Sequence, residues 1–132
     1  LHPHLIDEGV SHNQTGYNYV GTQGTLDYCR LNGVRIQPWT PLARGRFISP
    51  PTDASATERA LAQKIASFAE TLNTNREAIA LAWLLRHPAG FQPIVGTTDL
   101  QRVSDCCLAD GLEMSREDWY TLFNTARGKP VP

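Results

Sequence analysis

The turn in PIVGTTDLQR, residues 93–102, combines residue types that suit anion binding. An apolar strand pattern ends at Val95, and Gly96 would let the backbone approach a ligand closely. Thr98 and Gln101 have capping-box spacing, so we expect a helix to begin here with its free N–H groups facing the turn. These groups and the neighbouring hydroxyls predict a phosphate cradle.

Two charged residues of this turn support different interpretations of it. Arg102 would lie in the first turn of the helix, where its guanidinium could add bidentate contacts to a phosphate. Asp99 favours an alternative, because a carboxylate at the first helical position already satisfies the positive end of the helix dipole. An ordinary capped helix therefore stays open as the second interpretation.

Two other segments carry side chains that could recognise a ring or an amide. Trp39 is at the carboxyl end of a predicted strand, where α/β folds bind ligands. Its ring could stack on a planar group, or it could be a buried lid over the core. Asn13 and Gln14 are at the end of another predicted strand, and their amides carry the donor and acceptor that suit recognition of a second amide.

Other site chemistries find little support. The four histidines are scattered, and the three cysteines have neither disulfide nor zinc spacing, so we expect no metal site and interpret Cys29, Cys106 and Cys107 as buried packing residues. The sequence contains no nucleophile elbow, Cys-x-x-Cys pair or Walker loop. We therefore assign no residue a catalytic role.

Strand and helix patterns alternate along the chain. Short strands are predicted at 10–15, 34–39 and 91–95, and helices at 24–33, 56–73, 74–90, 99–111 and 115–128. The long loop at 40–57 suggests a binding or lid role. Alternation of this kind favours parallel strands and an α/β architecture. Three parallel strands leave two unpaired edges, so something else should complete the sheet.

Apolar spacing predicts which helix faces turn inward. The predicted inner positions are Leu26, Tyr28, Cys29, Leu61, Ile65, Phe68, Leu72, Ile79, Trp83, Leu84, Trp119, Leu122, Phe123 and Ala126. Gly33 has the position of a helix C-cap. Thr74 with Glu77, and Ser115 with Asp118, have the spacing of N-terminal caps.

Length and composition are those of one domain, residues 1–132, with a net charge of −1. The even charge balance argues against nucleic-acid and membrane partners. The start has neither the basic region nor the apolar run of a signal peptide, so we expect a cytoplasmic protein. Residue 1 is Leu, which indicates a fragment, a processed product or an engineered piece.

Taken together, NQTGYN, DYCRLNGVRIQPWTPLARGR, AIALAWLLRHPAGFQPIVGTTDLQRV and LEMSREDWYTLFNTARGKPVP resemble the C-terminal half of an aldo-keto reductase, from about Val10 onward. The resemblance implies a partial TIM (β/α)8 barrel: about three parallel βα units, strands six to eight, plus a C-terminal helix. It also implies NADP(H) as cofactor, with NAD as the alternative, bound at the C-terminal face of the strands.

The resemblance assigns cofactor-binding roles to nine residues. Gln14 would hold the nicotinamide carboxamide, Trp39 would stack on the nicotinamide ring, and Thr40 and Leu42 would follow the pyrophosphate. The residues implied at the adenosine end are Gly96, Thr97, Thr98 and Arg102 at the phosphates and Asp105 near the adenine. Preference for the 2′-phosphate of NADPH would rest mainly on Arg102 and the two threonines.

The family's catalytic Asp, Tyr, Lys and His come from the first half of the barrel, and no tyrosine of this chain matches the position of the proton donor. The resemblance thus implies the cofactor-binding half of a carbonyl reductase, inactive by itself. Its partners would be the dinucleotide and either the missing N-terminal half-barrel or a second copy. The alternatives are a non-catalytic nucleotide or anion-binding module that dimerises, and an inert remnant that associates through its open edges.

Overall fold

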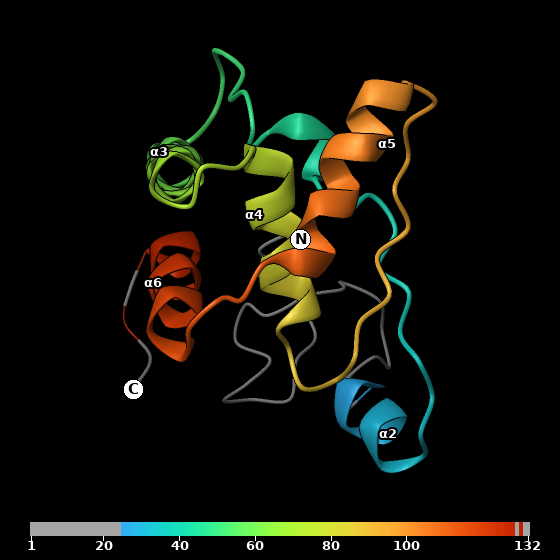
Figure 1. The fold of residues 1–132 in the computed structure, drawn as a ribbon. Coiled ribbons are helices and arrows are strands. Elements are labelled where there is room, and N and C mark those ends of the chain that lie inside the picture. The colour runs from blue at the N-terminus through green and yellow to red at the C-terminus, as the bar shows by residue number, and fades with distance from the viewer. Residues whose placement is uncertain (1–24, 129, 131–132) are drawn as a thin grey trace.

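The computed structural model describes residues 25–128 and 130 (Figure 1). The predicted strand at 10–15 lies outside these residues. The helices within them are α2 (Thr25–Leu31), α3 (Ala56–Thr71), α4 (Arg76–Leu85), α5 (Leu100–Cys107) and α6 (Arg116–Arg127), with short 3₁₀ turns η2 (Ala43–Gly45) and η3 (Leu108–Gly111). None of these helices is long and apolar enough to cross a membrane.

Helix α4 lies at the centre because it is apolar on nearly all sides. Its buried residues are Ala78, Ile79, Leu81, Ala82, Trp83 and Leu84. Helices α3 and α6 pack together on one side of it, and α5 with η3 covers another (Figure 1). The core thus separates α3 and α6 from the two extended segments, 34–39 and 91–95, that run past α5.

Two tryptophans join α4 to α6. The Trp83 indole N–H donates to the Trp119 carbonyl at 3.0 Å, and the Trp119 indole N–H donates to the Trp83 carbonyl at 2.9 Å. Their rings stack with centroids 4.7 Å apart, and Phe123 stacks beside them. The predicted inner faces of these two helices are confirmed.

The helix starts agree with the sequence in part. Ser115 caps α6 as predicted, accepting from the Asp118 N–H at 3.0 Å. The Thr74–Glu77 capping box is wrong: Asn75 is the N-cap of α4, and its side chain accepts from the Ala78 N–H at 2.7 Å. Asn75 has a second role, because its amide also donates to the Asp105 carbonyl at 3.2 Å. That bond ties α4 to α5.

Four further expectations need correction. Leu72 is 43% exposed and Tyr28 64% exposed, because α3 ends one residue before Leu72 and Tyr28 lies on the outer side of the short α2. The predicted helix 99–111 divides into α5 and η3. Of the cysteines, Cys106 is buried, Cys29 half-buried and Cys107 exposed, so packing explains Cys106 alone.

The predicted C-cap at Gly33 agrees with the structure, because Gly33 has the positive φ, +65°, expected at that position.

The segments 34–39 and 91–95 are paired in parallel, as predicted, but very briefly. The Gln92 N–H donates to the Ile36 carbonyl at 3.0 Å and the Ile94 N–H to the Pro38 carbonyl at 2.9 Å. The bridge between Trp39 and Ile94 is isolated, and the described residues form no longer strand. Pro38 has no N–H to donate back to its neighbour, which interrupts the ladder.

His87 is buried where α4 ends, 9% exposed, with its ring stacked on Phe91 at 4.7 Å between centroids. Its Nδ1 accepts a hydrogen bond from the Ala89 N–H at 3.1 Å, so the neutral ring is the form that the site holds. Burial, and secondarily the charge of Arg30, lowers the pKa of His87 to about 4 from 6.5.

We expect acid to destabilise the fold through His87. The unfolded chain binds this proton below pH 6.5 and the folded chain only near pH 4, so stability present above 6.5 is lost as the pH falls through that window. The loss should reach about 3 kcal/mol, measured by urea unfolding at each pH. In His87→Gln this slope should disappear. An unchanged slope in the variant would assign the acid sensitivity to other groups.

Candidate functional site

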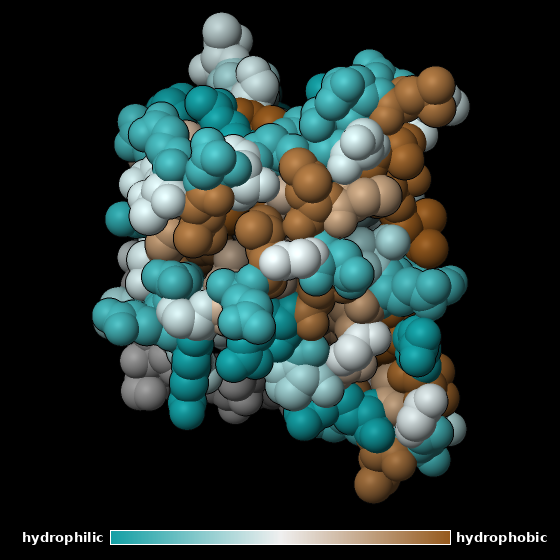
Figure 2. Space-filling view, viewed as in Figure 1, coloured by the Kyte–Doolittle hydropathy of each residue, from teal (hydrophilic) through white to brown (hydrophobic). Residues whose placement is uncertain are grey.

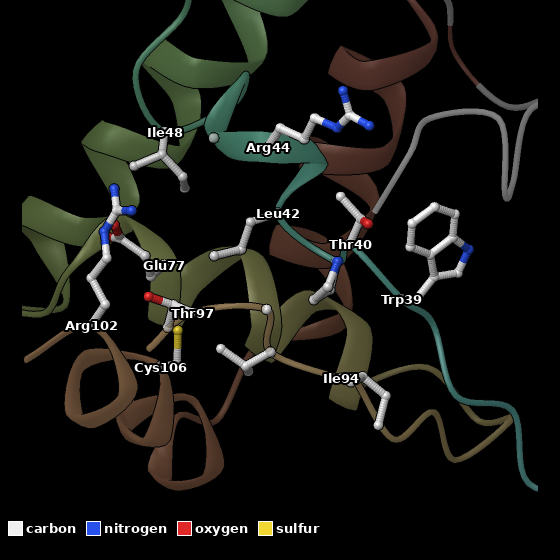
Figure 3. Close-up of a pocket in the computed structure, with 14 residues that line it drawn as sticks. Trp39, Thr40, Leu42, Arg44, Ile48, Glu77, Ile94, Thr97, Arg102 and Cys106 are labelled. Atoms are coloured by element: carbon white, nitrogen blue, oxygen red, sulfur yellow. The ribbon is translucent and has the colours of Figure 1, made fainter. Parts of the chain in front are cut away.

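A cleft of about 540 Å³ opens beside the two paired segments, a volume in the range of small-molecule sites (Figure 3). It lies between the loop that follows 34–39 and the turn that follows 91–95. The lining residues are Trp39, Thr40, Pro41, Leu42, Arg44, Gly45, Ile48, Glu77, Ile94, Val95, Gly96, Thr97, Arg102 and Cys106.

The parallel pairing explains why residues so distant in sequence share this cleft. The bridge between Trp39 and Ile94 sets the carboxyl ends of both segments side by side. The chain leaves each segment in the same direction, so both following loops meet at one edge. The cleft is therefore at the end of the strands where α/β proteins bind ligands.

Six of the nine residues that sequence reasoning proposed line this cleft: Trp39, Thr40, Leu42, Gly96, Thr97 and Arg102. Thr98 is exposed and does not line it. Asp105 lies on α5 outside the lining, and its carboxylate accepts from the Gln101 amide at 3.0 Å. Gln14 lies outside the described residues. In Figure 3, Trp39 and Arg102 lie at opposite ends of the cleft with Leu42 between them.

The start of α5 differs from the predicted phosphate cradle. Asp99, rather than Thr98, is the N-cap, and its carboxylate accepts from the N–H groups of Gln101 at 2.9 Å and Arg102 at 3.2 Å. The Thr98–Gln101 capping box is therefore wrong, and the second interpretation, an ordinary capped helix, holds here. The Thr97 hydroxyl is also engaged, accepting from the Asp99 N–H at 3.2 Å.

The backbone just before Asp99 keeps donors that a ligand could use. Among the described residues, none accepts a hydrogen bond from the N–H groups of Gly96, Thr97 or Thr98. A Cβ placed on Gly96 would meet no atom within 4 Å, so the space above this glycine is open. Donors therefore remain in the turn, although the helix N-terminus itself is satisfied.

The opposite wall of the cleft has a strained backbone. Thr40, Ala43 and Arg44 have φ values of 53°, 48° and 55°, in the left-handed region where L side chains cost roughly 1–2 kcal/mol each. Backbone bonds close this loop, from the Ala43 N–H to the Thr40 carbonyl at 2.9 Å and from the Gly45 N–H to the Leu42 carbonyl at 2.8 Å. Clustered strain of this kind is typical of ligand-binding segments.

Sequence reasoning missed two charged residues of the lining, Arg44 and Glu77. With Arg102 they give the cleft two cationic side chains and one anionic one, a net positive lining that suits an anion. Arg44 could have been found from its place beside Gly45 in the predicted loop, whereas nothing in the sequence relates Glu77, on α4, to this loop. Burial, with the nearby Glu77 carboxylate, raises the pKa of Cys106, so that thiol is neutral.

Trp39 is 71% exposed, so its interpretation as a buried lid is wrong. Its bridge partner Ile94 is 44% exposed, and Val34 and Val95 are also exposed. Figure 2 shows apolar surface along the edge of the molecule where segment 91–95 runs. The Trp39 ring is thus available to a flat ligand at the mouth of the cleft (Figure 3). No cluster of three metal-ligating side chains occurs in the described part of the chain.

Two parallel segments with a cleft at their carboxyl ends are the arrangement in which α/β proteins place ligand sites. The family model described as "Aldo/keto reductase family" matches residues 7–123, and the chain belongs to this family. A solved thermostable aldo-keto reductase, Tm1743, in complex with the inhibitor epalrestat, superposes with a TM-score of 0.63 at 23% identity. The superposed part is 78% of this chain and 34% of the solved chain, and it relates the fold to a (β/α)8 barrel.

Curated relatives are similar over most of the chain. A 6-dehydroglucose reductase of Novosphingobium aromaticivorans is 34% identical over 109 residues, covering 83% of this chain and 35% of the relative. Oxidoreductase YdhF of Escherichia coli is 33% identical over 110 residues, again 83% of this chain and 35% of the relative. The chain therefore spans about a third of the length of these relatives.

Proposed function

We propose that the chain is the cofactor-binding part of an NAD(P)H-dependent reductase of aldehydes or ketones, and that the cleft holds NADP(H). The observation that carries this proposal is the convergence of six sequence-proposed residues, from two loops more than 50 residues apart, on one cleft. The net positive lining and the turn N–H groups that have no acceptor among the described residues fit a dinucleotide, whose phosphates are anionic.

The order of the lining residues fits an extended dinucleotide (Figure 3). Trp39 would stack on the nicotinamide, Thr40 and Leu42 would follow the pyrophosphate, and Thr97 with Arg102 would meet the adenosine phosphates. Arg44, which lies in the same loop as Leu42, would add a cation near the pyrophosphate. The bound nicotinamide would supply a hydride, and these side chains would bind and orient it.

Among the described residues that line this cleft, no side chain has the usual character of a carbonyl proton donor. Their titratable side chains are Arg44, Glu77, Arg102 and Cys106, and none of these is a tyrosine or histidine. We therefore propose that the chain binds the cofactor and that residues beyond this sequence complete the catalytic centre.

The test is a calorimetric titration of the chain with NADPH, NADH and inorganic pyrophosphate, with thermal unfolding at saturation. We expect NADPH to bind at one site and to raise the unfolding temperature, by about 2.7 kcal/mol of stabilisation at a hundredfold excess over Kd. Reduction of an aldehyde should be undetectable without the rest of the barrel. Pyrophosphate binding as tight as NADPH binding would favour the anion-binding module, and no binding of any of the three would refute the proposal.

The partner that we propose is the rest of the barrel. The single bridge leaves both outer edges of segments 34–39 and 91–95 unpaired among the described residues, next to exposed Trp39 and Ile94. Light scattering of the same sample should show association that the separately expressed first half of a complete relative abolishes. A stable dimer that the added half leaves unchanged would instead favour self-pairing of these edges.

A further inference from the structure

Arg46 and Glu58 form a two-pronged ion pair at the end of the strained loop. The Arg46 Nε donates to Glu58 Oε1 at 2.6 Å, and the Nη2 donates to Oε2 at 3.1 Å. Asp53, 3.6 Å from the same guanidinium, is largely exposed. Bidentate contact fixes the orientation of both side chains as well as their distance.

Glu58 also belongs to the first turn of α3. Its Oε2 accepts from the Ser55 N–H at 2.8 Å, while the Ser55 hydroxyl accepts from the Glu58 N–H at 3.1 Å. This is a complete capping box, so Glu58 is held in place by the helix that it caps. Hydrogen bonding by Arg46, and then by Ser55, lowers the pKa of Glu58 to about 2, so its charge persists at neutral pH.

The loop is fixed on both sides of its strained part. Upstream, the bridge of Trp39 to Ile94 holds the chain. Downstream, Phe47 is buried, and the Arg76 guanidinium donates to the Ile48 carbonyl at 2.8 Å. The left-handed residues of 40–44 lie between these fixed points, and two of them, Thr40 and Arg44, line the cleft. Strained conformations persist when their surroundings determine them in this way.

We propose that Glu58, which does not line the cleft, is a positioning residue. Through its ion pair with Arg46 it holds loop 40–45 in the conformation that binds the cofactor. The inference rests on the function proposed above for the cleft. A wall that is ordered before the ligand arrives need not be ordered on binding, so the pair should increase affinity through preorganisation.

Three variants test the pair. Arg46→Met removes the guanidinium and leaves the capping box whole, Glu58→Gln keeps an amide oxygen for the Ser55 N–H, and the third variant combines both. Asp118→Asn is the matched control, because Asp118 has the same place after the N-cap Ser115 of α6 as Glu58 has after Ser55, and its carboxylate accepts from the Ser115 hydroxyl at 2.7 Å, away from the cleft. Asp53→Asn tests the exposed partner of Arg46.

Three quantities are measured for each variant: the Kd for NADPH, the unfolding temperature, and the rate of trypsin cleavage after Arg44, which reports opening of the loop. We expect Arg46→Met and Glu58→Gln to raise Kd about tenfold and to speed cleavage by a similar factor, as expected when the competent loop falls to about a tenth of molecules. The double variant should be no worse than Arg46→Met. Both controls should stay within twofold.

The outcomes separate this inference from the proposed function. If the wild-type chain does not bind NADPH, the proposed function fails, and the cleavage rates alone decide whether Glu58 holds the loop. If NADPH binds and neither Kd nor cleavage changes in the two single variants, the positioning role is refuted. A loss of thermal stability in Glu58→Gln equal to that in Asp118→Asn, with no change in Kd, would reduce Glu58 to a helix cap.

Discussion

Replacement of Trp83 by alanine is expected to lower the free energy of unfolding by about 4 kcal/mol, a large part of the stability of a domain of this size. The variant loses a buried indole at the centre of the core, its stacking on Trp119 and its hydrogen bond to the Trp119 carbonyl. Urea unfolding followed by circular dichroism measures the change.

Trp39→Ala is the matched control for this prediction. It removes the same side chain from a position that is 71% exposed, and it should change stability by less than about 0.5 kcal/mol. Trp119→Ala should lower the free energy of unfolding by a similar amount to Trp83→Ala. The double variant should lower it by less than the sum of the two single losses, because both single variants remove the same stacking contact. Equal midpoints for Trp83→Ala and Trp39→Ala would contradict the packing described here.

Replacement of Arg102 by alanine is expected to weaken NADPH binding by about 30-fold, the loss of roughly 2 kcal/mol for a hydrogen-bonded charge on a phosphate. Arg102 lines the cleft at the end opposite Trp39 and opposite the nicotinamide in our assignment (Figure 3). The affinity for NADH, which lacks the 2′-phosphate, should fall much less. Arg102→Lys should lie between the two, because an ammonium cannot make a forked contact.

Arg116→Ala controls for the change in net charge. Arg116 is exposed on α6, where its guanidinium lies over the Tyr120 ring at 5.7 Å, and it is not part of the cleft. Its removal should leave the affinity for NADPH within about twofold at moderate ionic strength. If Arg102→Ala and Arg116→Ala weaken binding equally, Arg102 acts through net charge alone and has no direct contact with the phosphate.

The core around Trp83 and the proposed cofactor site around Arg102 show which features the sequence could predict. The inner faces of α4 and α6 follow from apolar spacing within each helix, and burial at Ile79, Trp83 and Leu122 confirms them. The helix starts could be predicted only to within a residue. Thr74 and Asn75 are both good caps, so the local pattern does not distinguish them, and in the structure it is Asn75 that caps α4 and bonds to the Asp105 carbonyl, 30 residues away.

Some residues of the candidate site could likewise be predicted from the sequence, and others could not. Trp39, Thr97 and Arg102 could be proposed from strand ends, turn residues and family resemblance, because each belongs to a local pattern. Glu77 joins them only because α4 packs beside the turn, and the left-handed conformations of Thr40, Ala43 and Arg44 have no signature in these residue types.

The sequence by itself determined the family, the helices and the two segments that carry the proposed cofactor residues. The tertiary structure decided that the backbone pairing of Trp39 with Ile94 brings those segments together, that Asp99 satisfies the start of α5, and that Glu58 pairs with Arg46 at the end of the strained loop. The physical reason is the distance along the chain over which each kind of interaction acts. Periodicity and capping act over a few residues, whereas a cleft depends on contacts between segments that only packing brings into reach.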